Sequence, residues 1–307
     1  MAAPDPAFDT SPEQRATFRS FLYRQLFVTP PLPTDVDLQG KRAIVTGANT
    51  GIGLECARQL LDLRVSRLII AVRNEEKGQR AKASLIAGRQ VAADAVQVWK
   101  LDLESYDSIG SFIERAGALD RLDIAVLNAG VMNQKHVLTA ATGREQTIQV
   151  NVLSTALLAI LLLPLLRAKI PSGPPGRLSI VSSDMASWAK FKEASATPLL
   201  PALDWPESFD VPERYCVSKV LGQLFVSELS KRVPASAVLI TMPSPGLCYG
   251  TALGVAPGGS LVDSVAGVIK RIIGRSTSVG ARALTDGAVH HGAEAHGHYL
   301  EDCQIRP

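Results

Sequence analysis

The chain has 307 residues, of which 46% are hydrophobic and 20% charged, and its 32 basic and 29 acidic residues leave a formal net charge of +3. This composition is close to the globular average and excludes disordered and fibrous proteins. The near balance of charge gives no indication of nucleic-acid binding. None of the four cysteines forms a CxxC pair, so we expect a reduced, cytoplasmic protein without disulfides.

Residues 1–37 precede the first strong strand pattern and predict a helical extension with a proline-rich linker. Four apolar side chains share one face of this helix: Phe18, Phe21, Leu22 and Leu26. The arginines are expected on its other faces: Arg15, Arg19 and Arg24. We expect the helix to dock on its own chain, and a membrane-surface or partner-binding helix is the alternative. Residues 1–9 are acidic and contain proline, so no secretory signal is expected.

From residue 42 onward, apolar strand patterns alternate with helical ones. Strands are predicted over 42–45, 67–72, 96–101, 122–127, 177–182 and 237–241, and helices over 53–63, 75–87, 106–116, 143–169 and 212–232. Continuous apolar strands separated by helices are typical of a parallel sheet covered on both faces. We therefore predict a single doubly wound α/β domain of the Rossmann type over residues 38–307. It carries an insert at 184–214 and a substrate lid at about 247–275.

The most apolar run of the chain covers residues 152–166. It is shorter than the roughly 20 residues that a membrane-spanning helix needs. A buried helix is therefore expected, without membrane insertion.

A glycine-rich turn directly follows the first predicted strand. Residues 46–53 read Thr-Gly-Ala-Asn-Thr-Gly-Ile-Gly, and Gly47, Gly51 and Gly53 allow a tight turn and a close approach to a pyrophosphate. The next helix offers its N-terminal amides to that anion. The alternative is a turn that is rich in glycine without binding a nucleotide.

The end of the second strand indicates which dinucleotide is bound. An NAD site usually has an acidic residue there for the ribose 2′-hydroxyl, whereas this chain has Arg73 followed by Asn74. A guanidinium pairs well with the 2′-phosphate of NADP, so we expect NADP(H). An ordinary surface role for Arg73 is the alternative.

Tyr215 and Lys219 are four residues apart on a predicted helix and share one face. A nearby ammonium stabilises a phenolate and lowers the tyrosine pKa, and such a tyrosine exchanges a proton with a carbonyl or alcohol oxygen. Ser182 and Ser183 end the fifth strand, at the sheet edge where ligands bind. Either hydroxyl could contact the substrate oxygen or cap the next segment.

Taken together, these motifs resemble the classical short-chain dehydrogenase/reductase family over about residues 38–255. Asp102, the run Asn128-Ala129-Gly130 and the turn Pro245-Gly246 match further motifs of that family. The resemblance implies a catalytic tetrad of Asn151, Ser183, Tyr215 and Lys219. It implies a cofactor site made of Gly47, Asn49, Thr50, Gly51, Ile52, Gly53, Arg73, Asn74, Asp102, Leu103, Asn128, Ala129, Gly130, Tyr215, Lys219, Pro245 and Gly246.

The family mechanism assigns a role to each member of the tetrad. Ser183 orients the carbonyl oxygen and Tyr215 donates the proton. Lys219 lowers the tyrosine pKa and holds the nicotinamide ribose, and Asn151 positions a water of the proton relay.

A narrower resemblance is to the retinol-dehydrogenase-like branch, especially its fungal members. It rests on residues 27–31, 73–74, 245–249 and 297–303. It implies a place in secondary metabolism. Together with Arg73 and the aromatic insert described below, it leads us to expect an NADP(H)-dependent enzyme that reduces a carbonyl of a bulky apolar small molecule. The alternatives are an alcohol dehydrogenase working oxidatively and a repurposed, non-redox cyclase or scaffold. Family members commonly pair their long helices, so a homodimer or homotetramer is expected.

Three features depart from the family pattern. The insert contains four aromatic residues that either form a wall of the substrate pocket or cover a small core of their own: Trp188, Phe191, Trp205 and Phe209. Thr251 stands one place later than usual after Pro245-Gly246, which puts its contact with the nicotinamide carboxamide in doubt. Four histidines lie close in sequence, but we expect a surface loop or helix end rather than a metal site: His290, His291, His296 and His298.

Overall fold

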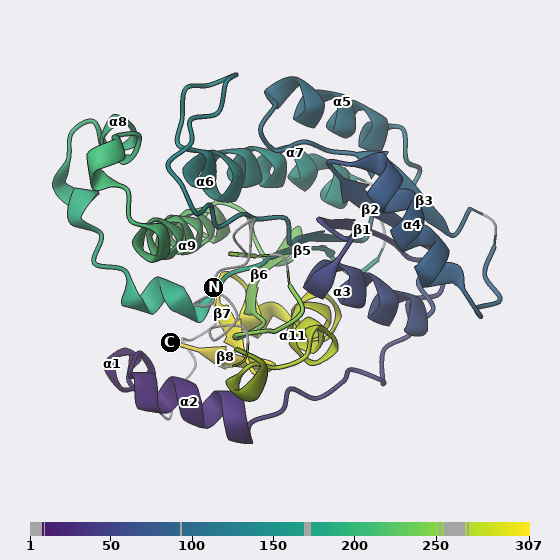
Figure 1. Cartoon of the computed structure of the whole chain (residues 1–307). Helices are drawn as coiled ribbons and strands as arrows, with labels where there is room; N and C mark the ends of the chain where they lie inside the picture. The colour runs from purple at the N-terminus through teal and green to yellow at the C-terminus, as the bar shows by residue number, and fades with distance from the viewer. Residues whose placement is uncertain are drawn as a thin grey trace.

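A computed structural model of the chain describes residues 8, 10–92, 94–168, 173–251, 253–254, 268 and 270–307. Within them, one sheet of eight strands has the order β3-β2-β1-β4-β5-β6-β7-β8 (Figure 1). The strands are β1 (Arg42–Thr46), β2 (Arg67–Val72), β3 (Val96–Lys100), β4 (Ile124–Leu127), β5 (Gly176–Ile180), β6 (Val238–Ser244), β7 (Tyr299–Glu301) and β8 (Gln304–Arg306). All neighbouring strands are parallel except β7 and β8.

Helices cover both faces of this sheet (Figure 1). One face carries α3 (Gly51–Asp62), α4 (Glu75–Ile86) and α11 (Thr277–Val289), and the other carries α5 (Tyr106–Gly117), α7 (Thr155–Ala168) and α9 (Val211–Ser230). Each set packs on the sheet through its own apolar core. The order of connection changes direction between β1 and β4, and ligands bind in such sheets at this switch point, beyond the carboxyl ends of the strands.

The predicted doubly wound parallel sheet is confirmed, with two differences. Strands β7 and β8 were not predicted, because three residues each are too few to show a period. The helix expected from residue 143 starts later, with α6 (Gln146–Ile148) and the π-helical turn η1 (Gln149–Ser154) leading into α7. Gly143 has φ +66°, which is not helical backbone.

At the N-terminal end, α1 (Pro12–Arg15) and α2 (Phe18–Phe27) lie beside β7 and β8 (Figure 1). The predicted apolar face of α2 is wrong in part. Its buried residues are Phe21, Arg24 and Gln25, whereas the side chain of Leu26 is half exposed. Arg24 and Gln25 can be buried because charged and backbone partners on the rest of the chain pair with them.

One part of the insert at 184–214 borders the main cavity of the protein, and the rest covers a small core of its own. It forms η2 (Asp184–Trp188), η3 (Lys192–Ser195), α8 (Leu199–Leu203) and η4 (Pro206–Ser208). Phe191 and Leu203 pack into a small separate core with Ile148 and Val217, and Trp205 is exposed. Only the first turn of the insert, which includes Trp188, borders the main cavity described below.

Among the described residues, one helix, Gln146–Arg167, is long and apolar enough to cross a membrane by length and composition. Core helices of soluble proteins pass the same test, and this one supplies Leu158 and Leu162 to the core beneath the sheet. Most of the expected lid, and the residues 1–7 and 9 on which the secretory-signal expectation rests, lie outside the described residues.

Candidate active site

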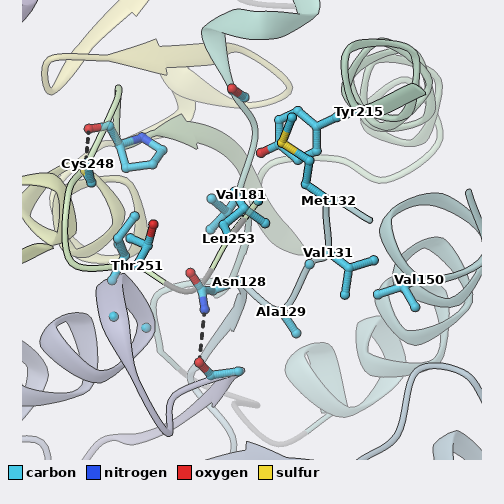
Figure 2. A pocket seen from close by; sticks show the side chains of 18 of the residues that line it. Asn128, Ala129, Val131, Met132, Val150, Val181, Tyr215, Cys248, Thr251 and Leu253 are labelled. Atoms are coloured by element: carbon cyan, nitrogen blue, oxygen red, sulfur yellow. Dashed lines mark hydrogen bonds between the residues drawn. The ribbon is translucent and has the colours of Figure 1, made fainter. Parts of the chain in front are cut away.

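A cavity of about 1190 Å³ opens at the carboxyl edge of the sheet. Figure 2 shows Tyr215 and Met132 toward one end of it and Asn128 and Thr251 toward the other. Its lining includes every residue predicted for the cofactor site except Asn74. The Asn74 side chain instead accepts a hydrogen bond from Lys77 N at 2.8 Å and caps α4.

Two glycines of the turn have no space for a side chain. A Cβ atom on Gly53 would lie 2.4 Å from Asn128 Nδ2, and one on Gly47 would lie 2.9 Å from Ala129 Cα. Asn128, directly after β4, holds the turn in place, since its Nδ2 donates to Thr46 O at 2.9 Å. The same Nδ2 donates to Gly47 O at 3.5 Å (Figure 2). Asn128 therefore supports one side of the turn, and the other side of the turn borders the cavity.

The N-terminal end of α3 borders the cavity directly after the glycine turn. Thr50 is the N-cap of this helix and makes no capping hydrogen bond through its side chain in the described structure. Thr251 lies 3.8 Å from the position of a Cβ atom on Gly51, so the shifted threonine still borders the same loop. A tight turn before uncapped helix amides suits a pyrophosphate, and the residues present therefore fit a dinucleotide.

Arg73 borders the cavity beyond the end of β2, with a side chain that is 66% exposed. Its Nη1 atom lies 2.6 Å from a carboxylate oxygen of Glu104, a partner that the sequence did not indicate. Glu104 stands two residues after Asp102, whose side chain accepts a hydrogen bond from Glu104 N at 3.0 Å. The cation expected to bind a 2′-phosphate is thus present at the cavity, already paired with an acid.

Three predicted catalytic side chains meet where β5 ends. Lys219 Nζ donates to Val181 O at 2.9 Å and lies 5.6 Å from the centre of the Tyr215 ring. Ser183 is hydrogen-bonded to the buried Tyr215 side chain and also accepts from Met185 N at 3.2 Å. Ser183 therefore both reaches the tyrosine and caps η2, whereas Ser182 Oγ accepts a hydrogen bond from Gln223 at 2.8 Å.

Burial controls the electrostatics of this group. It raises the pKa of Tyr215, and the hydrogen bond with Ser183 opposes that shift. Burial also lowers the pKa of Lys219 to about 8. Desolvation of the phenolate is the largest influence on the pKa of Tyr215, which therefore lies above its ordinary value and not below it as expected.

Asn151 stands in the π-helical turn next to this group. Its Oδ1 accepts from Val131 N at 2.8 Å, and its Nδ2 donates to Val131 O at 2.9 Å and to Ser218 Oγ at 3.1 Å. A second cavity of about 20 Å³ lies between Asn151 and Lys219, which is room for about one water molecule.

Asp184 is a polar group of the site that sequence reasoning missed. It follows Ser183, borders the main cavity, and its Oδ2 is buried with no hydrogen-bond partner among the described residues. Burial raises the pKa of this carboxyl, while Ser183 and Arg24 oppose the shift. The sequence did place Asp184 next to the predicted catalytic Ser183, and this position could have indicated that it belongs to the site.

Three of the four clustered histidines have side-chain partners within the fold. His290 and His291 share Asp286, at 2.9 and 2.7 Å, and His296 Nε2 contacts Val233 O at 2.8 Å. Within the described part of the chain, no group of three or more histidine, cysteine or acidic residues could hold a metal ion.

A parallel sheet with a glycine turn at its switch point and a serine, tyrosine and lysine at the same edge defines the class of nucleotide-binding oxidoreductases. The family model for the short chain dehydrogenases matches residues 41–195. The chain belongs to this short-chain dehydrogenase family.

The chain is 49% identical over 306 residues to the short-chain dehydrogenase fogG of Aspergillus ruber, covering 98% of this chain and 88% of that relative. It is 41% identical to the short chain dehydrogenase/reductase mfmJ of Annulohypoxylon moriforme, covering 94% and 84%. A solved short chain dehydrogenase of Shigella flexneri, complexed with NADP, shares the fold, with a TM-score of 0.58 and 19% identity over 88% of this chain and 100% of that chain.

Proposed function

We propose that this protein is an NADPH-dependent reductase of a carbonyl group on a bulky, mainly apolar small molecule. One observation carries the proposal. Ser183, Tyr215 and Lys219 border the same cavity as the glycine turn and Arg73, so a bound nicotinamide and a carbonyl could meet there.

NADP(H) is the proposed cofactor. Arg73 stands where an NAD site usually has an acid, and the related Shigella flexneri structure is complexed with NADP. Gly47, Gly51, Gly53 and the amides of α3 would hold the pyrophosphate, and Arg73 the 2′-phosphate. When bound, NADPH supplies the hydride for carbonyl reduction.

The chain supplies the proton. Ser183 holds the carbonyl oxygen beside Tyr215, and the phenol donates its proton to that oxygen. The raised tyrosine pKa keeps the phenol protonated at neutral pH. Lys219 and a water in the small cavity beside Asn151 return a proton to Tyr215.

The proposed substrate class follows from the lining of the main cavity, which includes several large apolar side chains: Phe18, Phe21, Met132, Val137, Met185, Trp188, Leu247, Leu253 and Ile273. Its volume exceeds the roughly 300–1,000 Å³ of ordinary ligand pockets, which leaves space for a substrate beside a dinucleotide. The fungal relatives support a place in secondary metabolism. Membership of the retinol-dehydrogenase-like branch is proposed from residues 27–31, 73–74, 245–249 and 297–303 alone.

We also propose a cytoplasmic homodimer. The cysteines are free thiols, three of them buried. The outer faces of α7 and α9 expose Ile160 and Leu224 by 47% and 55%, and these apolar side chains would be buried between two copies.

The test is to incubate the purified protein with NADPH and a panel of bulky ketones, and with NADP⁺ and the corresponding alcohols. We expect ketone-dependent loss of NADPH, with NADH much less effective. Turnover of alcohols alone would favour the oxidative alternative. Cofactor binding without turnover in either direction would favour the repurposed, non-redox alternative and contradict the proposal.

A further inference from the structure

Helix α2 presents two aromatic side chains to the main cavity. Phe18, Phe21 and Gln25 stand at i, i+3 and i+7 and therefore share one face of the helix. Phe18 and Phe21 line the cavity, with their ring centres 5.8 Å apart and stacked. The extension before the nucleotide-binding sheet thus forms part of the wall of the site.

The row continues into the segment that follows the catalytic serine. The rings of Phe21 and Trp188 meet edge to face, 5.2 Å apart. Trp188 ends the turn η2, which Ser183 caps at its start, so the aromatic row begins one short turn from the hydroxyl that is proposed to hold the carbonyl. The indole N–H donates to Ala16 O at 2.8 Å, and the ring therefore offers the cavity only its apolar surface.

Buried polar contacts fix the position of α2. Gln25 donates to Leu247 O at 3.0 Å and to Ile273 O at 3.2 Å, and it accepts from Leu247 N at 3.1 Å. Arg24 Nε lies 3.2 Å from a carboxylate oxygen of the buried Glu301. Buried polar groups are costly without partners, so these contacts hold the helix in one register.

Two further residues are shaped to this helix. Arg275 donates to Arg24 O at 3.0 Å and to Val28 O at 2.9 Å, at the C-terminal end of α2. A Cβ atom on Gly246 would lie 2.4 Å from Gln25 Oε1. The turn after β6 and the N-terminal helix therefore fit together, and Phe18 and Phe21 are held by the same frame as the catalytic edge.

We propose that Phe18, Phe21 and Trp188 form a recognition wall for a planar aromatic or conjugated ring system that carries the reacting carbonyl. Aromatic rings favour stacked and edge-to-face contacts with other rings beyond the gain from buried area, and this wall offers three rings in a row. The inference rests on the proposed function and names the substrate class as aryl or polycyclic ketones and quinones.

The opposite face of α2 offers a matched control. Tyr23 and Phe27 are exposed by 62% and 73% and lie outside the lining of the main cavity. They contact each other at 5.5 Å between ring centres. Truncating Tyr23 removes an aromatic ring from the same helix without touching the wall.

The experiment is calorimetric titration with 9,10-phenanthrenequinone, with and without saturating NADP⁺, which does not react with a quinone. Phe18→Ala and Phe21→Ala are each expected to weaken quinone binding about tenfold, and Tyr23→Ala to leave it unchanged. Phe21 is buried, so its truncation endangers folding, whereas Phe18 is 61% exposed. If Phe21→Ala does not fold, the result with Phe18→Ala alone tests the inference.

Reduction of 2,3-butanedione by NADPH is the second readout. Tyr23→Ala, outside the lining of the cavity, should keep the wild-type kcat/KM for it. Because this diketone has no ring to stack on the wall, the phenylalanine variants should lose less kcat/KM for it than for the quinone. The inference is overturned if the wild-type protein does not bind the quinone, if Phe18→Ala binds it normally, or if Tyr23→Ala weakens binding equally. A protein that binds the quinone through Phe18 but reduces neither diketone contradicts the proposed function and retains the recognition wall.

Discussion

The guanidinium of Arg73 and the carboxylate of Glu104 form an ion pair at the edge of the main cavity, 2.6 Å between Nη1 and Oε1. Because Glu104 carries the same sign of charge as a 2′-phosphate, it competes with that phosphate for the guanidinium. The proposed preference for NADPH over NADH therefore depends on both residues.

Substituting Arg73 and substituting Glu104 should change the cofactor preference in opposite directions. Arg73→Glu removes a charge-assisted contact and adds a repulsion, so NADPH affinity should fall about tenfold or more. Glu104→Gln removes the competing charge, so NADPH affinity should rise while NADH affinity is unchanged. Calorimetric titration of both variants with both cofactors measures this, and an unchanged preference in Arg73→Glu would show that Arg73 does not bind the 2′-phosphate.

The rate of carbonyl reduction should fall as the pH rises through about 8. Burial lowers the pKa of Lys219 to about 8, so the ammonium loses its proton there, while the raised pKa of Tyr215 keeps the phenol protonated. The profile of kcat/KM against pH reports these groups in the free enzyme. Lys219→Arg stays charged, so its residual activity should show no such fall; a flat wild-type profile would remove Lys219 from the proton path.

The glycine turn should tolerate no methyl group at Gly53. A Cβ atom there would lie 2.4 Å from Asn128 Nδ2 and 2.7 Å from Gly47 O, so Gly53→Ala should lower the free energy of unfolding by about 1–3 kcal/mol and weaken cofactor binding. Gly110→Ala is the control, because this exposed helical glycine has open space around it. It should raise the free energy of unfolding by up to about 1 kcal/mol. Urea denaturation compares them, and equal stability of the two variants would be inconsistent with a tightly packed turn.

The proposed dimer predicts a role for Leu224 on the outer face of α9. Leu224→Lys would place a charge in the interface and should weaken self-association about tenfold or more. Leu32→Lys is the control, since Leu32 is also exposed but lies in the N-terminal linker. Light scattering after size-exclusion chromatography gives the mass, and the same mass for wild type and Leu224→Lys would exclude this interface.

Most of the fold could be predicted from local sequence patterns, because strand and helix periods and the turn at Gly47 are visible in neighbouring residues. Contacts between distant residues were not visible. Glu104 reaches Arg73 across 31 positions, and Gln25 reaches Leu247 across 222. The burial of Arg24 could not be predicted from its charge. It depends on an ion pair with Glu301, which belongs to a strand too short to predict.

The direction of the Tyr215 pKa shift could not be predicted from the sequence for a related reason. Spacing placed Lys219 on the same helix face, which suggested a lower tyrosine pKa. Spacing says nothing about desolvation, and in the folded chain desolvation is the largest influence on both groups.

The most direct test of the account is the rate of NADPH oxidation by a ketone substrate in wild type and in Tyr215→Phe, with NADPH affinity measured alongside by calorimetry. If Tyr215 donates the proton, the variant should keep its NADPH affinity and lose about 10²–10⁴-fold in kcat. A variant that reduces the ketone at the wild-type rate would contradict the central claim that this phenol is the acid of a carbonyl reductase.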